Sequence, residues 1–192
     1  AKIHGRPFLD ILLTNLKNHG IQKIVLATGY GGDKVRNHCE RNPIVNNLTF
    51  SHEDSPLGTG GALKKALPLV SSANIIVING DTICPVDYVE FLNFHLAKKA
   101  LMSSILVSRN REDSGGVMTA PDSVLTDYRE RASIATHPVM SAGIYIFNRE
   151  AIRHMPEGEI FSLEYDFIPE LVKTRRCYGY FTRAPVIDIG TP

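Results

Sequence analysis

The spacing of apolar residues changes several times along the chain, and each change predicts a different element. Apolar side chains between residues 8 and 16 recur at the spacing of an amphipathic helix, and Gly20 follows as a stop signal. The short apolar run at residues 23–27 is typical of a strand. The run at residues 74–78 is continuously apolar and rich in β-branched residues, which predicts a parallel strand covered on both faces.

Helical and strand patterns then alternate over most of the chain. Further helices are predicted at residues 33–41, 61–67, 86–99 and 164–174, and further strands at 48–52, 104–108, 141–147, 178–182 and 186–189. This alternation predicts an α/β fold, a Rossmann-like three-layer sandwich with a mostly parallel mixed sheet. Residues 116–119 and 124–128 are short and alternating, so we expect a small antiparallel excursion there. The surrounding stretch 109–138 is a candidate interface for a homo-oligomer.

Composition narrows the class of protein. The 192 residues suit one domain, and a net charge of +1 with well-mixed signs argues against a nucleic-acid partner. Three cysteines lie far apart, which argues against a disulfide framework and a structural zinc site and favours a reducing, cytoplasmic location. No apolar run approaches the roughly 20 residues that span a bilayer, so no membrane association is expected.

A glycine-rich stretch, LGTGGA at residues 57–62, lies between a predicted strand and a predicted helix. Backbone N–H groups of such a turn can face a ligand, and the missing side chains let a base or phosphate approach closely. The equally common alternative is a purely structural turn. The pattern is neither a P-loop nor a Rossmann G-x-G-x-x-G.

Two aspartates stand at the ends of predicted strands. Asp81 closes the run NGD directly after residues 74–78, where open α/β sheets bind ligands, although the three residues could equally form a plain turn. Asp188 lies within an apolar run and is expected to be a buried carboxylate, which is costly unless it is paired or bound to a metal. If the two strands bring both carboxylates to one edge, a cation is the natural occupant of the space between them.

Other polar positions carry weaker signals. Glu164 follows Ser162, a candidate helix cap, and could accept hydrogen bonds from sugar hydroxyls, or it could simply favour the first helical turn through the helix dipole. His95 lies among apolar neighbours and is expected to belong to the core.

Six motifs, in order along the chain, resemble those of the sugar-1-phosphate nucleotidyltransferases. They are GRPFL at residues 5–9, Glu53 with LGTGGA at 57–62, NGD at 79–81, ER at 130–131, SAGIY at 141–145 and DIGTP at 188–192. Residues 161–171 look most like the branch that makes GDP-D-glycero-D-manno-heptose, which is closely related to the mannose-1-phosphate guanylyltransferases.

The resemblance implies a role for each matching position. The nucleotide would be held by Glu53, Leu57, Gly58, Thr59, Gly60, Asn79 and Gly80. The sugar phosphate would be held by Gly143, Glu164 and Arg131, the last standing where the family has lysine. Asp81 and Asp188 would be catalytic and would bind Mg²⁺. The reaction implied is transfer of a nucleotidyl group from an NTP, with GTP as the expected donor, to heptose 1-phosphate or mannose 1-phosphate, releasing pyrophosphate.

One departure from the family pattern concerns the start of the chain. The family's phosphate-binding loop lies upstream of GRPFL, so we expect residues 1–192 to be a single catalytic domain shortened at its N-terminus and also at its C-terminus. The polypeptide is accordingly expected to have little activity by itself. Two alternatives stay open: a non-catalytic member that binds nucleotide sugars and regulates or scaffolds a partner, and an unrelated α/β oxidoreductase, which the lack of G-x-G-x-x-G disfavours.

Overall fold

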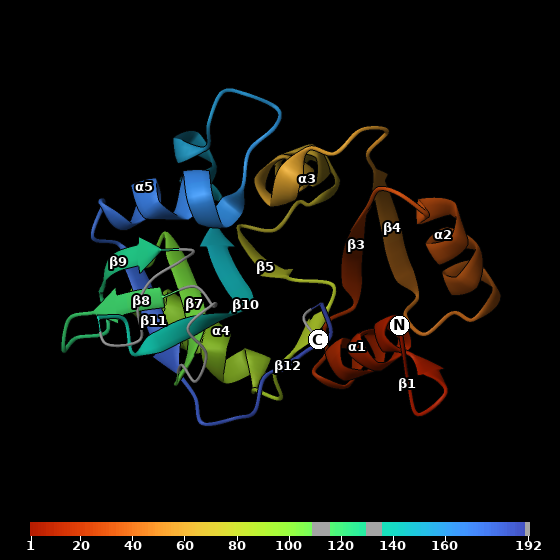
Figure 1. Ribbon diagram of the computed structural model, residues 1–192, viewed down its shortest axis with the longest axis horizontal. Coiled ribbons are helices and arrows are strands. Elements are labelled where there is room, and N and C mark those ends of the chain that lie inside the picture. Colours follow the sequence, from red (N-terminus) through yellow and green to blue (C-terminus); the bar gives the residue numbers. More distant parts are fainter. Residues whose placement is uncertain (109–115, 130–135, 191–192) are drawn as a thin grey trace. The chain divides into compact units, whose positions relative to one another are not determined.

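The computed structural model describes residues 1–108, 116–129 and 136–190 (Figure 1). The chain divides into two compact units. The first comprises Ala1–Ser71 with Gly158–Phe161, and the second comprises Ser72–Glu157 with Ser162–Pro192. The prediction of one catalytic domain stays a prediction.

The first unit is built on two parallel strands and three helices. Its elements are β1 (Lys2–Ile3), β2 (Arg6–Pro7), α1 (Phe8–Asn18), β3 (Lys23–Thr28), α2 (Gly32–Arg41), β4 (Asn47–His52), α3 (Gly58–Ala66) and the 3₁₀ turn η1 (Leu67–Leu69). Strands β3 and β4 run parallel with Lys23 opposite Asn47 and Thr28 opposite His52. The β1–β2 hairpin was not predicted; its turn depends on positive φ angles at His4 and Gly5.

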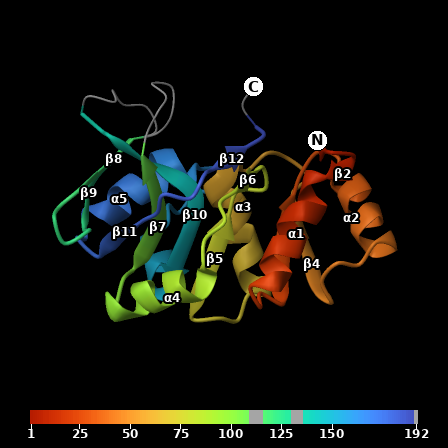
Figure 2. The ribbon, with the colours of Figure 1, turned by 90° about the horizontal axis from the view of Figure 1, so that it is seen from below.

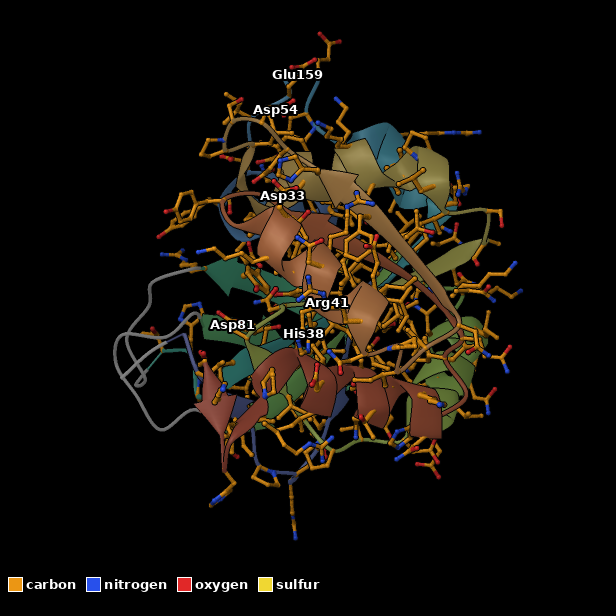
Figure 3. All side chains as sticks on the ribbon, turned by 90° about the vertical axis from the view of Figure 1, so that its right-hand side faces the viewer. Asp33, His38, Arg41, Asp54, Asp81 and Glu159 are labelled. Atoms are coloured by element: carbon orange, nitrogen blue, oxygen red, sulfur yellow. The ribbon has the colours of Figure 1, made fainter. Side chains whose placement is uncertain are left out.

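Alternate residues along β3 and β4 point to the same face, and the core of the first unit lies on that face. The buried cluster consists of Leu13 of α1, Cys39 of α2 and Val45 of the loop that follows. Partly buried residues of one face of the strands pack against it, namely Ile24, Leu26, Leu48 and Phe50, together with Leu9, Val35 and Ile44 from the helices and the loop. His38 and Arg41 of α2 (Figure 3) line a pocket of about 380 Å³ together with Lys34, Asn37 and Asn42. None of the residues predicted for the site lines this pocket.

The second unit contains a mixed six-stranded sheet. Its elements are β5 (Asn74–Ile78), β6 (Thr82–Ile83), α4 (Tyr88–Ala97), β7 (Met102–Ser108), β8 (Gly116–Thr119), β9 (Leu125–Arg129), β10 (Val139–Asn148), the 3₁₀ turn η2 (Arg149–His154), the π-helical turn η3 (Leu163–Phe167), α5 (Ile168–Val172), β11 (Cys177–Phe181) and β12 (Ile187–Asp188). The strand order is β11-β7-β10-β8-β9, with β5 on β10. Strands β7 and β11 are parallel, whereas β10 is antiparallel to β5, β7 and β8. The mixed α/β fold and the antiparallel β8–β9 excursion are confirmed.

Aromatic residues of α4 and of η3 pack on this sheet. Figure 2 shows the strands of the sheet with helices α4 and α5 beside them. On one face Phe91 and Phe94 of α4 lie 5.4 and 5.3 Å, between ring centroids, from Tyr180 of β11. On the other face Phe147 of β10 lies 5.7 Å from Phe167 of η3. Alternate residues of a strand point to opposite faces, so α4 and the η3–α5 segment enclose the sheet from both sides.

Two predicted elements differ from the structure. In β5 only Ile75 is fully buried, and the strand pairs antiparallel with β10, so the expected parallel strand covered on both faces is wrong. A run of apolar residues indicates that a segment is hydrophobic, but it does not determine which other segments pack on it or in which direction the neighbouring strand runs. The helix expected at 164–174 is instead the π-helical turn η3 followed by the short α5, with Pro169 in the first turn of α5.

His95 is confirmed as a core residue. Its side chain is 1% exposed, Nδ1 lies 2.9 Å from the Ser103 hydroxyl and Nε2 lies 3.2 Å from Asn74 Oδ1. Burial lowers the pKa of His95 from 6.5 to about 4. The folded protein therefore disfavours the imidazolium, whereas the unfolded chain accepts the proton readily.

This lowered pKa predicts an acid-sensitive fold. Because the unfolded state binds more protons between pH 6.5 and 4, the free energy of unfolding should fall as pH decreases through that window, by about 3 kcal/mol in total. Replacing His95 with glutamine, which keeps a polar group near Ser103, should remove this component. Thermal unfolding followed by circular dichroism from pH 7 to 4 measures it. Parallel Tm–pH curves for the two proteins would contradict the assignment.

The three cysteines are buried in the two units. Cys39, Cys84 and Cys177 are free and buried. Burial raises the pKa of each thiol, that of Cys177 to about 12, so all three are poor nucleophiles in the folded protein. In the described part of the chain no helix has the length and apolar character needed to cross a membrane.

Candidate active site

A short antiparallel ladder brings the two predicted catalytic aspartates together in the second unit. Strand β6 pairs with β12 so that Asp188 stands opposite Thr82, the neighbour of Asp81. The Asp81 carbonyl accepts a hydrogen bond from the Ile189 N–H at 3.0 Å, and the Asp81 carboxylate accepts one from the Thr82 hydroxyl at 3.2 Å. The predicted convergence of the two residues is thus seen in the structure.

The carboxylates of Asp81 and Asp188 both lie close to Gly190. A Cβ atom at this position would collide with Asp81 Oδ2 and lie 3.3 Å from Asp188 Oδ1, so both carboxylates border the space that the missing side chain leaves. The Gly190 N–H also donates to Asp188 Oδ1 at 2.7 Å. Two carboxylates that border one small space are a fitting donor set for a divalent cation, because Mg²⁺ commonly takes one or two carboxylates and completes its shell with water and substrate phosphates.

The expected burial of Asp188 is wrong. Asp188 and its neighbour Ile187 are both exposed, and β12 is only two residues long. Burial therefore gives no reason for a metal at Asp188, and the feature that favours a cation is the proximity of the two carboxylates. In residues 1–108, 116–129 and 136–190 no group of three or more His, Cys, Asp or Glu side chains could hold a metal ion. A cation here would take its remaining ligands from water or substrate.

Asn79 and Gly143 form a second contact in the same unit. Gly143 has a φ of 67° and lies where the β10–β7 register shifts between Ser141 and Tyr145. Its carbonyl accepts the Asn79 N–H at 3.0 Å, and a Cβ here would lie 2.7 Å from the Asn79 amide nitrogen. The glycine is required because a left-handed backbone and a close side chain coincide.

Glu164 lies in the first turn of η3. The Ser162 hydroxyl accepts the N–H groups of Glu164 and Tyr165, each at 3.2 Å, which confirms the predicted cap. The same hydroxyl lies 3.3 Å from Glu164 Oε2 as a donor. Single π-helical turns are frequent at functional sites, and here the turn presents a half-buried carboxylate.

The predicted nucleotide turn belongs to the first unit. Helix α3 begins at Gly58, three residues earlier than expected, so Gly58, Thr59 and Gly60 form its first turn and not a loop before it. Glu53 follows β4, and its carboxylate accepts the Leu57 N–H at 3.4 Å. Glu53 therefore lies beside the start of the turn.

The N–H groups of Gly60 and Gly61 do not face a ligand. Both donate to the Phe161 carbonyl, at 3.0 and 3.2 Å. The expectation that the backbone donors of this turn point to a base or phosphate is therefore wrong for these two residues. Sequence reasoning gave no role to Phe161 or to Gly190, although Phe161 begins the stretch 161–171 that resembles the heptose branch and Gly190 belongs to the DIGTP motif.

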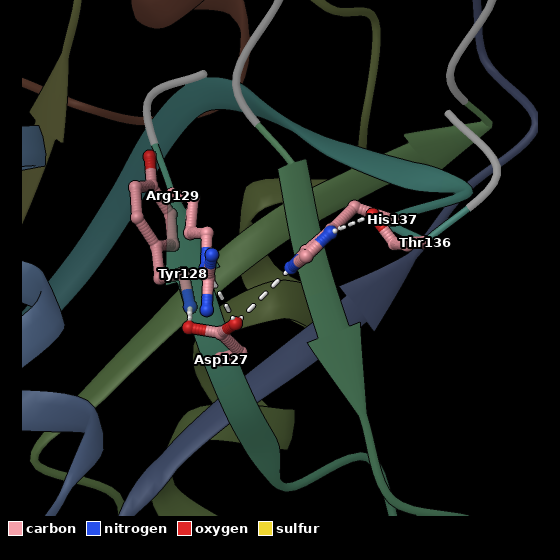
Figure 4. A network of polar contacts seen from close by, with 5 residues as sticks. All are labelled: Asp127, Tyr128, Arg129, Thr136 and His137. Carbon is pink, nitrogen blue, oxygen red and sulfur yellow. Dashed lines mark hydrogen bonds and ion pairs between the residues drawn. The ribbon is translucent and has the colours of Figure 1, made fainter. Parts of the chain in front are cut away.

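A polar network surrounds Asp127 of β9 (Figure 4). Asp127 accepts hydrogen bonds from Arg129 Nε at 2.9 Å and from His137 Nε2 at 3.2 Å. Burial acts to raise the pKa of the Asp127 carboxyl, but these hydrogen bonds outweigh it and hold the pKa below its usual value. Arg131, together with Thr191 and Pro192 of the DIGTP motif, lies outside the described residues.

The chain is a mixed α/β protein whose second unit brings Asp81 and Asp188 together through the paired strands β6 and β12. A family model described as "Nucleotidyl transferase" matches residues 2–192, and the chain belongs to this family. The motif resemblance found in the sequence is thereby confirmed at the level of the family.

Individual relatives share moderate identity with the chain. It is 30% identical to a D-glycero-alpha-D-manno-heptose 1-phosphate guanylyltransferase of Aneurinibacillus thermoaerophilus, over 100% of this chain and 83% of the relative. It is 28% identical to a mannose-1-phosphate guanylyltransferase of Mycobacterium tuberculosis, over 98% of this chain but only 54% of that protein. The crystal structure of HddC from Yersinia pseudotuberculosis superposes with a TM-score of 0.88 at 31% identity, covering 100% of this chain and 84% of that one. A second HddC structure, complexed with GMP-PN, gives a TM-score of 0.85 at 30% identity, with the same coverage of both chains.

Proposed function

We propose that this protein transfers the GMP unit of GTP to a sugar 1-phosphate, either heptose 1-phosphate or mannose 1-phosphate, to give a GDP-sugar and pyrophosphate. The observation that carries the proposal is the pair Asp81 and Asp188 around Gly190, in a chain of the nucleotidyl transferase family. Guanine and the two sugars are supported by the names of the relatives and by the GMP-PN complex of HddC.

In the proposed reaction one bond forms and one breaks. An oxygen of the sugar phosphate attacks the α-phosphorus of GTP, and the bond to the β-phosphate breaks as pyrophosphate leaves. A Mg²⁺ ion held by Asp81 and Asp188 would supply positive charge against the phosphate oxygens. The protein's own contribution is positioning, since no covalent intermediate is required.

The roles proposed for the remaining residues follow from the resemblance and the local geometry. Glu53 and the turn at residues 57–60 would hold the base and ribose, and Asn79 and Gly80 would border the nucleotide. Gly143 and Glu164 would bind the sugar, with Arg131 on its phosphate. The contact between Asn79 and Gly143 supports this division, because the two substrates must meet during the reaction and the residues proposed to hold them should then be neighbours.

The direct test is a pyrophosphate-release assay on the full-length protein with Mg²⁺. We expect turnover with GTP and heptose 1-phosphate or mannose 1-phosphate, little turnover with UTP, CTP or dTTP, and none after chelation by EDTA. A protein that binds GDP-sugar but releases no pyrophosphate with any NTP and sugar pair would be the non-catalytic alternative. Equal turnover with all four NTPs would overturn the choice of guanine.

The cellular setting is also a proposal. The three free, buried cysteines support a reducing compartment such as the cytoplasm. Homo-oligomer formation through residues 109–138 stays a prediction, and part of that stretch lies outside the described residues.

A further inference from the structure

The segment Gly158–Phe161, here named the strap, is bound to the first turn of α3 within the first unit. Phe161 is 5% exposed, and its N–H donates to the Leu57 carbonyl at 3.0 Å. Its carbonyl in turn accepts the N–H groups of Gly60 and Gly61. The strap thus uses two of the four N–H groups that lack a partner within the helix at the start of α3.

The glycines of the turn are spaced to admit the strap. A Cβ at Gly60 would collide with the Phe161 ring, and one at Gly61 would collide with the Glu159 carbonyl. At Gly58, whose φ is 74°, a Cβ would lie 2.6 Å from the Phe161 carbonyl oxygen. The strap backbone and the Phe161 ring therefore approach α3 so closely that a side chain at any of the three glycines would collide with them.

A lysine binds the other end of the strap. Lys64, one helical turn further along α3, donates from Nζ to the Gly158 carbonyl at 3.2 Å. The same Nζ lies 5.9 Å from the centroid of the Phe161 ring, within the range of a cation–π contact. The strap is therefore attached to α3 at its first residue by Lys64 and at its last by Phe161.

Phe161 is followed directly by the cap of the Glu164 turn. Ser162, its successor in the chain, accepts the N–H groups of Glu164 and Tyr165 and donates to the Glu164 carboxylate. Phe161 contacts the predicted nucleotide turn, and Ser162 orients the carboxylate of Glu164, which is predicted to bind the sugar. These two residues are joined by a peptide bond.

We propose that Phe161 is a positioning residue that sets the geometry of both substrate-binding turns, the glycine turn at residues 57–61 and the Ser162–Glu164 cap. This inference rests on the proposed function. A buried phenylalanine with a purely structural role would affect stability alone. A positioning residue would in addition weaken the binding of both substrates, because hydrogen bonds to a substrate weaken steeply when the groups that make them are displaced or misaligned.

The experiment compares the effect of a Phe→Leu substitution at two buried positions, Phe161 and Phe91. Phe161→Leu keeps an apolar side chain but removes the ring from Gly60, and Phe91→Leu makes the same change in α4, where the ring is 0% exposed and packs on Tyr180. Calorimetric Kd values for GTP and for the sugar 1-phosphate, with Tm, are measured on the full-length protein and both variants. We expect Phe161→Leu to raise both Kd values about 10-fold, and Phe91→Leu to lower Tm and leave both Kd values within about 2-fold.

A milder variant keeps the test decisive if Phe161→Leu folds poorly. Lys64→Met removes the donor to the Gly158 carbonyl without opening the core, and should raise both Kd values about 3-fold. Unchanged Kd values in Phe161→Leu and Lys64→Met would overturn the inference, as would a change in only one substrate. Failure of the unmodified protein to bind GTP would instead overturn the proposed function.

Discussion

Replacing Asp81 or Asp188 with asparagine should lower kcat/KM for guanylyl transfer by about 10³-fold or more. The substitution keeps the shape of the side chain but removes one of the two negative charges that border Gly190. A metal ion stabilises developing phosphate charge by several kcal/mol, and each 1.36 kcal/mol corresponds to about a factor of ten in rate. Steady-state pyrophosphate release across a Mg²⁺ titration measures both the loss and the shift in metal requirement.

The fold should tolerate both substitutions. The asparagine oxygen can still accept the Thr82 hydroxyl at position 81 and the Gly190 N–H at position 188. Asp33→Asn is the matched control, because Asp33 is an exposed aspartate in the first turn of α2 (Figure 3). It should retain activity within about 2-fold, as expected for the substitution of an exposed surface charge. Full activity in both Asp81→Asn and Asp188→Asn would contradict the assignment of the metal site.

Replacing Gly190 with alanine should lower kcat/KM about 10- to 100-fold and raise the Mg²⁺ concentration needed for half-maximal rate. The new methyl group would occupy the space between the carboxylates, where it collides with Asp81 Oδ2. Because neither charge is removed, the decrease in kcat/KM would come from displacement of the carboxylates. Displacement should lower kcat/KM less than removal of one carboxylate charge does. Rates measured at increasing Mg²⁺ concentration separate a weakened metal site from a general loss of activity.

A second glycine provides the control for this prediction. A Cβ at Gly158 meets nothing within 4 Å, and Gly158→Ala should therefore leave both activity and Mg²⁺ dependence nearly unchanged. The same Mg²⁺ requirement in Gly190→Ala as in the unmodified protein would show that the metal does not lie between Asp81 and Asp188.

The sequence alone was sufficient for the elements that local chemistry controls. The spacing of apolar residues predicts the helix that begins at Phe8 and the strands β3, β4, β7 and β10. Each element buries one face, and the residues of that face recur at the spacing typical of a helix or a strand. The Ser162 cap is predictable for the same local reason. The ordered motifs also identified the nucleotidyltransferase family, since each motif combines residue types that rarely recur together by chance.

Tertiary structure decided what surrounds these elements. The exposure of Asp188, the antiparallel pairing of β5 with β10 and the use of Gly60 and Gly61 by Phe161 all depend on segments distant in sequence. The spacing of apolar residues predicts which side chains can be buried, and a glycine indicates where another segment can approach closely. Neither pattern predicts which segment makes the contact. The physical reason is that burial and hydrogen bonding are properties of a pair of segments, whereas a sequence pattern describes one segment at a time.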